Sequence, residues 1–152
     1  VVWRVERGLS RAPPPADDVD NLYKFGEQIG LAFQLQDDYL DVYGDPKVFG
    51  KKIGGDIISN KKTYMLINAF NKANVRQRKE LERWIGCENF NHNEKVAAVT
   101  ALYNSIGVDK MAIERINYYF DEANKYLDAV KVSADRKTEL VAYAQRMLHR
   151  KR

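Results

Sequence analysis

Three aspartates near the predicted end of one helix constrain this chain most: Asp37, Asp38 and Asp41. At about 100° per residue, Asp37 and Asp41 lie one turn apart on the same helix face, with Asp38 beside them. Like charges at that spacing repel by roughly 0.2–0.5 kcal/mol per pair. No lysine or arginine stands three or four residues away to offset this repulsion. A solvated acidic patch is the alternative, but the segment is too apolar for one, since it contains Phe33, Tyr39, Leu40, Val42 and Tyr43.

The sign of the charge reverses after the aspartates. Every charged residue from Phe25 to Pro46 is acidic, whereas residues 47–63 hold five lysines against Asp56 alone. A glycine-rich turn separates the two groups. Mg²⁺ prefers carboxylate oxygens and keeps waters and substrate phosphates as its other ligands. The layout therefore indicates a site that binds divalent metal and a diphosphate together.

The ordered motif extends well beyond the aspartates. It reads Phe33-Gln34-x-x-Asp37-Asp38-x-x-Asp41, Gly44-Asp45, Gly50-Lys51, Gly54-x-Asp56 and Lys61-x-Thr63. This string resembles the second aspartate-rich region of trans-isoprenyl diphosphate synthases, and it is most similar to the farnesyl and geranylgeranyl diphosphate synthase group. The resemblance runs from about Asp17 to the C-terminus, although past Phe70 it rests on helical character. It implies an all-α fold, the C-terminal part of the isoprenoid-synthase helical bundle.

The resemblance also implies an activity, the Mg²⁺-dependent head-to-tail condensation of isopentenyl diphosphate with an allylic diphosphate. In the family, two aspartate-rich motifs face each other across a central cavity and hold the ions. The ions stabilise leaving-group charge and orient the substrate. The allylic diphosphate leaves, and the double bond of isopentenyl diphosphate attacks the resulting carbocation.

Individual roles carry over onto the matching positions. Asp37 is implied as a metal ligand, with Asp38 and Asp41 as neighbouring ligands or supporting groups. Lys51 and Lys61 fall where the family contacts the allylic diphosphate.

Five further positions in this region have less direct roles. Phe33 and Gln34 fall in the substrate site, and the Gln34 amide would face the carbocation. Asp56 matches an acidic position near the metal and its waters. The resemblance leaves the roles of Lys52 and Lys62 open between substrate contact and solvent.

The chain also departs from the family pattern. It lacks the first aspartate-rich motif and the basic residues that hold isopentenyl diphosphate, so this chain of 152 residues looks like the C-terminal half of a synthase and is expected to be inactive without the N-terminal half. Three alternatives are a non-catalytic subunit of a heteromeric synthase, a terpene-cyclase relative and a helical interaction module without chemistry. In cyclases the corresponding motif has a serine or threonine at the position of Asp41 and a glutamate at the position of Asp45, eight residues after Asp37. The aspartates found here favour chain elongation over cyclisation.

The first sixteen residues do not follow the pattern. They contain three arginines and end with the prolines Pro13, Pro14 and Pro15, and such a triplet stops a helix. We therefore predict a separate leader over residues 1–16, a linker or an aberrant stretch, and a helical domain over residues 17–152.

Composition excludes several classes of protein. A formal charge of +4 without interleaved basic and aromatic residues predicts no nucleic-acid surface. The lone Cys87 fits a reducing cytoplasm, and no apolar run is long enough to span a membrane. Loss of half a helical domain would expose apolar faces, so a homodimer is expected.

The hydrophobic pattern predicts helices and no strand of useful length. The first runs from an Asp17 cap to Tyr43, followed by a loop over 44–55. Its core stripe holds Val19, Leu22, Gly26, Ile29, Phe33 and Leu40, and Gly26 and Gly30 should allow close helix contact.

Further helices are predicted toward the C-terminus. They cover residues 57–72, a charged stretch ending near Gly86, residues 93–106 stopped by Gly107, and residues 109–131 capped by Asp109. Ser133 should cap the last helix. The predicted core side of the 109–131 helix holds Ile113, Ile116, Phe120, Ala123 and Leu127.

Overall fold

The computed structural model describes residues 15–45 and 53–148. All regular structure in these two ranges is helical, which confirms the all-α prediction. The helices are α1 (Ala16–Tyr43), α3 (Gly55–Ile58), α4 (Tyr64–Lys72), α5 (Val75–Gly86), α6 (His92–Ile106), α7 (Val108–Ala129) and α8 (Ala134–Leu148). No helix in the described ranges combines the length and apolar character needed to cross a bilayer.

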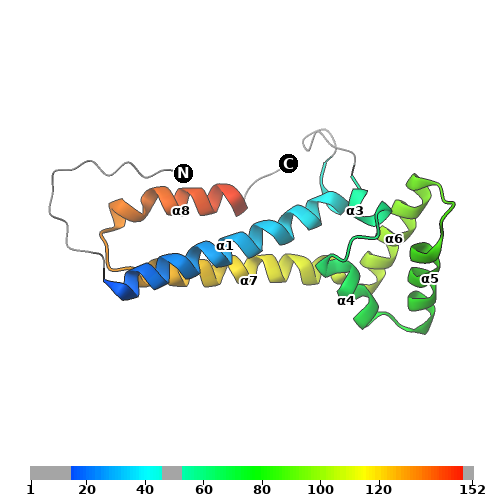
Figure 1. The fold of residues 1–152 in the computed structure, drawn as a ribbon, viewed down its shortest axis with the longest axis horizontal. Helices are drawn as coiled ribbons and strands as arrows, with labels where there is room; N and C mark the ends of the chain where they lie inside the picture. The colour runs from blue at the N-terminus through cyan, green and yellow to red at the C-terminus, as the bar shows by residue number, and fades with distance from the viewer. Residues whose placement is uncertain (1–14, 46–52, 149–152) are drawn as a thin grey trace.

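The long helices α1 and α7 form the spine of the molecule, and they lie side by side over most of their length (Figure 1). Ala32 of α1 and Ala123 of α7 have no exposed surface and belong to the core that the two helices share. Helix α8 lies against the same pair and contributes Ala144 to their shared core. The larger side chains of this core are Phe25, Ile29, Leu35, Ile116, Phe120 and Leu127.

A second core lies at the other end of the spine, where α4, α5 and α6 gather around the end of α1 and the start of α7 (Figure 1). Met65, Leu81 and Val108 are fully buried there. The Tyr43 hydroxyl donates a hydrogen bond of 2.7 Å to Asn104 Oδ1, which links the end of α1 to α6.

The start of α1 differs from the prediction. The helix begins at Ala16, one residue before the expected Asp17 cap, and its N-cap residue is Pro15. Asp17 lies in the first turn, where its negative charge suits the helix dipole. The adjacent Asp18 is buried, and its Oδ1 accepts a 2.9 Å hydrogen bond from the backbone N–H of Lys131. Asp18 therefore ties the start of α1 to the chain that leaves α7.

The buried face of α1 is also rotated from the predicted stripe. Val19 and Leu22 are 51% and 39% exposed, although Ile29 is buried as expected. Helix α7 packs against a different face of α1 from the predicted one, and that face carries the buried core residues. Gly26 and Gly30 lie elsewhere, and an added Cβ at either would meet no atom within 4 Å. The close helix contact predicted at these glycines is not made by any described residue.

The predicted continuous helix over residues 57–72 is wrong. The short α3 ends at Ile58, and α4 starts only at Tyr64. Asn60 adopts a left-handed conformation with φ of 54°, which a continuing helix does not allow. Thr63 then caps α4, its Oγ1 accepting a 3.2 Å hydrogen bond from the Leu66 N–H. The turn over residues 59–63 therefore separates two helices.

The other helices follow the prediction more closely. Helix α5 ends at Gly86, and α6 is stopped by Gly107, whose φ of 84° suits glycine. Gly107 also stands at the N-cap of α7, so Asp109 is a first-turn residue and not the cap. Ile113 is 42% exposed, contrary to prediction, because Ala112 takes the buried position.

We predict that Ile116→Ala lowers the free energy of unfolding by about 2–5 kcal/mol, because it opens a cavity between α1 and α7. Ile113→Ala on the same helix is the matched control and should change it by less than about 0.5 kcal/mol. Urea unfolding followed by circular dichroism measures both variants. Equal losses would mean that α7 does not present the Ile116 face to α1.

Candidate functional site

Lys61 contacts two of the three aspartates that we call the acidic cluster, Asp38, Asp41 and Asp56. Its Nζ is 2.8 Å from Asp38 Oδ1 and 2.9 Å from Asp56 Oδ2. Asp38 comes from α1 and Asp56 from α3, so the ammonium joins two elements that are separated in sequence. The Lys61 side chain is about half exposed, whereas the two carboxylates are largely covered. The hydrogen bonds to Asp38 and Asp56 raise the pKa of Lys61 above its ordinary value, so the ammonium stays charged at neutral pH.

Asp41 holds the backbone of Asp56 in place. Its Oδ2 accepts a 2.8 Å hydrogen bond from the backbone N–H of Asp56, and its backbone carbonyl accepts one from Gly54. Burial raises the pKa of the Asp41 carboxyl, although the hydrogen bond from the Asp56 N–H opposes that shift. Asp41 thus holds the first turn of α3 against the end of α1 and places the Asp56 side chain beside Lys61.

A groove of about 250 Å³ opens beside Asp38, and we call it the Gln34 groove. Its walls come from α1, α7 and the start of α4: Leu31, Gln34, Leu35, Asp38, Lys62, Tyr64, Arg115 and Tyr119. Arg115 is exposed, and a hydrogen bond to Tyr64 raises the pKa of its guanidinium. The Gln34 groove therefore combines an amide, two cations and aromatic surface next to the acidic cluster.

The structure brings together several residues singled out from the sequence. Asp38, Asp41, Asp56 and Lys61 form one connected cluster, and Gln34 and Lys62 lie in the adjoining groove. Phe33 and Asp37 are partly buried side chains of α1. Lys51 and Lys52 lie outside the described residues.

The cluster can supply only part of a metal site. Within residues 15–45 and 53–148, no three His, Cys, Asp or Glu side chains are arranged to hold an ion. The carboxylates of Asp37, Asp38 and Asp41 are nevertheless hard oxygen donors, and Mg²⁺ is commonly held by one or two carboxylates with phosphate oxygens and waters. These carboxylates could therefore supply part of a Mg²⁺ ligand set, with the remaining ligands from outside the described residues.

Sequence reasoning missed Asn60, Tyr64 and Arg115. Asn60 fixes the turn before Lys61, while Tyr64 and Arg115 form the far wall of the Gln34 groove. The pair Ser59-Asn60 before the Thr63 cap was an available signal, because asparagine tolerates the left-handed conformation. Nothing in the local sequence places Arg115 opposite Gln34, because the packing of α7 on α1 creates that proximity.

We predict that Asp41→Ala lowers the free energy of unfolding by about 1 kcal/mol, because the Asp56 N–H loses its acceptor. Asp41→Asn keeps an acceptor oxygen and is the matched control. Since the pKa of Asp41 is higher in the fold than in the unfolded chain, its ionisation costs stability as pH rises through the folded pKa. Asp41→Asn should therefore be at least as stable as the unaltered chain at pH 7.

Urea unfolding at pH 7 and amide exchange of Asp56 measure these effects. An Asn variant as unstable as the Ala variant would contradict the role of Asp41 as an acceptor.

The sequence of this chain matches known proteins. The profile of the Polyprenyl synthetase family matches residues 5–103. The farnesyl pyrophosphate synthase of Mus musculus is 42% identical over 88 residues, which cover 57% of this chain and 23% of that enzyme. The short chain isoprenyl diphosphate synthase of Methanocaldococcus jannaschii is 37% identical over 90 residues, covering 59% of this chain and 28% of that protein. The profile match begins at Val5, so the boundary at residue 16 stays a prediction.

The fold matches solved structures as well. The crystal structure of a geranylgeranyl pyrophosphate synthase has a TM-score of 0.80 and 32% identity, and the likeness covers 91% of this chain and 43% of that one. A geranylgeranyl pyrophosphate synthase from Corynebacterium glutamicum, solved with isoprenyl diphosphate and magnesium, has a TM-score of 0.79 and 29% identity. The likeness covers 90% of this chain and 38% of that one.

This chain thus spans less than half the length of these relatives. The resemblance to trans-isoprenyl diphosphate synthases that the motif predicted is confirmed. With more than half of its residues matched by the family profile, the chain belongs to the polyprenyl synthetase family.

Proposed function

We propose that this chain is the C-terminal half of a Mg²⁺-dependent prenyltransferase of isoprenoid biosynthesis, which joins isopentenyl diphosphate to an allylic diphosphate head to tail. The observation that carries the proposal is the Lys61 ammonium between the Asp38 and Asp56 carboxylates, beside the Gln34 groove. The arrangement sets carboxylates for a cation and an amine for a diphosphate within one small region. The Corynebacterium glutamicum relative, whose structure contains isoprenyl diphosphate and magnesium, supports the same chemistry.

The carboxylates would bind the metal from one side. Asp37 is the proposed direct ligand, while Asp38 and Asp41 lie next to it on α1. Asp38 already holds Lys61, and Asp41 holds the Asp56 backbone, so these two carboxylates also position the basic side of the site. When bound, Mg²⁺ would neutralise the charge that develops on the leaving diphosphate.

The lysines and the groove would bind the allylic substrate. Lys61 is half exposed with its charge retained, so its ammonium can also donate to phosphate oxygens. We assign the same role to Lys51. Gln34 is exposed in its groove, where its amide oxygen can face positive charge, and Phe33 lies one residue away on α1.

The missing N-terminal half is the first proposed partner. Gly26, Gly30, Phe33 and Asp37 fall within about 60° of arc on α1 at 100° per residue. The two glycines of this stripe are exposed, and a methyl group placed on either would meet no atom within 4 Å. A second helical layer carrying the first aspartate-rich motif could pack there and close the site above Asp37.

A homodimer in the cytoplasm is the proposed state of the assembled protein. Several large apolar side chains of the described residues are exposed, among them Val19, Tyr23, Leu31 and Tyr143. Extended apolar surface is uncommon on soluble monomers. A second copy and the N-terminal half would together cover it.

We predict that Lys61→Met weakens Mg²⁺-dependent binding of inorganic pyrophosphate roughly tenfold, because it removes a charge-assisted hydrogen bond. Lys72→Met, at the exposed end of α4, is the control and should change the affinity less than about twofold. A chemical-shift titration of the 152-residue chain detects such weak binding. Equal affinity in the Lys61 variant and the unaltered chain would remove Lys61 from the site.

We predict negligible condensation by this chain alone and restored turnover when a matching N-terminal half is added. Positioning of two substrates can supply roughly 7–11 kcal/mol of the barrier, and one half of the site cannot provide it. The assay follows radiolabelled isopentenyl diphosphate with an allylic partner and Mg²⁺, and light scattering reports the assembly. Asp37→Ala should reduce the restored turnover more than Asp41→Ala. Robust product from this chain alone would contradict the division of the site between two halves.

A further inference from the structure

Lys95 of α6 is a buried charge outside the proposed site. Its side chain is among the largest fully buried ones of the chain, with 1% of its surface exposed. Within residues 15–45 and 53–148, no carboxylate forms an ion pair with it. A buried ammonium is costly unless it is well hydrogen-bonded, and burial lowers the pKa of Lys95. A charge kept at this position calls for a reason.

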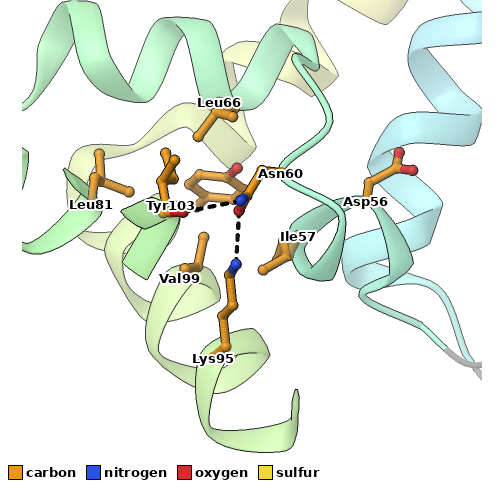
Figure 2. Close-up of a pocket in the computed structure, with 9 residues that line it drawn as sticks. Asp56, Ile57, Asn60, Leu66, Leu81, Lys95, Val99 and Tyr103 are labelled. Atoms are coloured by element: carbon orange, nitrogen blue, oxygen red, sulfur yellow. Dashed lines mark hydrogen bonds between the residues drawn. The ribbon is translucent and has the colours of Figure 1, made fainter. Parts of the chain in front are cut away.

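Two contacts stabilise the Lys95 ammonium. Its Nζ donates a 2.7 Å hydrogen bond to Asn60 Oδ1, the contact drawn in Figure 2. The same Nζ lies 4.1 Å from the centroid of the Phe90 ring, a distance typical of a cation–π interaction. Figure 2 also shows the Asp56 carboxylate pointing away from Lys95, and that carboxylate binds Lys61 instead.

The cavity around Lys95 is too small for a ligand. It has a volume of about 10 Å³ and is lined mainly by apolar side chains such as Ile57, Leu81 and Val99. That volume is at the lower limit for a single water molecule. Any functional effect of Lys95 must therefore pass through the residues it touches.

Asn60 is the residue through which such an effect can pass. It is the one non-glycine residue with positive φ in the described ranges. Its Oδ1 accepts from Lys95, and its Nδ2 donates a 3.1 Å hydrogen bond to the Ile85 carbonyl. The Asn60 side chain is thus anchored to α6 and to the last turn of α5, which offsets the steric cost of its left-handed backbone.

The anchored turn leads directly into Lys61. The backbone N–H of Lys61 donates a 2.9 Å hydrogen bond to the Asp56 carbonyl, and its side chain reaches Asp38 and Asp56. We propose that Lys95 is a positioning residue that, by holding Asn60, fixes the turn at residues 59–63 and aims Lys61 between Asp38 and Asp56. The link to diphosphate binding rests on the proposed function, whereas the link to the turn does not.

Lys95→Met tests this proposal, because methionine fills a similar volume without the charge. Amide hydrogen exchange of Lys61 should accelerate at least about tenfold, since the turn loses its anchor. The midpoint of urea unfolding should fall only slightly, because Asn60 Oδ1 loses its donor while the cost of burying an ammonium is removed. Lys79→Met on the exposed face of α5 is the control and should change neither quantity.

Two Asn60 variants approach the same contact from the other side. Asn60→Gly keeps the left-handed turn accessible but removes both side-chain hydrogen bonds, so it should reproduce the faster Lys61 exchange without altering α6. Asn60→Asp keeps an oxygen for Lys95 and should retain slow exchange. If Lys95→Met does not fold, the Asn60 pair still decides the question.

A double-mutant cycle with inorganic pyrophosphate and Mg²⁺ tests the functional link. Lys95→Met should weaken binding about fivefold when Lys61 is present and less than about twofold in the Lys61→Met background. Equal weakening in both backgrounds, or Lys61 exchange that does not change, would overturn the proposal. If the unaltered chain binds no pyrophosphate while Lys95→Met still accelerates Lys61 exchange, the diphosphate function fails and the positioning role stands.

Discussion

The packing of α1 along α7 determines which side chains of α1 are available for chemistry. The core between them contains the fully buried Ala32 and Ala123 together with larger apolar side chains such as Ile29 and Phe120. Because one face of α1 packs on α7, the stripe that carries Gly26, Phe33 and Asp37 lies on another face of the helix. The same contact brings Arg115 and Tyr119 of α7 opposite Gln34 and creates the groove beside Asp38.

The position of Lys61 depends on the interruption between α3 and α4. A helix running through residues 57–72 would carry Lys61 along a continuous surface. Instead α3 ends at Ile58, Asn60 turns the backbone, and Thr63 starts a new helix. Asp41 anchors the beginning of this segment, and the Asn60 side chain, held by Lys95, anchors its middle. Two anchors on different helices give an otherwise irregular segment a defined shape.

The described residues combine a cluster ordered by hydrogen bonds with exposed apolar side chains. Hydrogen bonds link Asp41 to Asp56 and join Lys61 to Asp38 and Asp56. Yet no described residue covers the face of α1 that bears Gly26 and Gly30, and several large apolar side chains are exposed. Hydrogen bonds between neighbouring segments can form within one half, whereas burial of a helix face needs a second layer.

The sequence by itself determined the helical fold, the family and the identity of the charged residues. Charge repulsion among Asp37, Asp38 and Asp41, the reversal of charge after Pro46 and the stop at Gly107 are all local signals. The end of α1 at Tyr43 and the ends of α5 and α6 were therefore predictable. These features depend on residues close together in the chain, where spacing and backbone preference are enough.

Only the tertiary structure decided which helix faces are buried and how the turn that carries Lys61 is held in place. Val19, Leu22 and Ile113 fit a helical stripe as well as their buried neighbours do, and the approach of α7 selects between the possible faces. The break at Asn60 depends on Ile85 and Lys95, which are 25 and 35 residues away. Contacts of that range leave no periodic trace in the sequence, because each rests on a single hydrogen bond between residues brought together by folding.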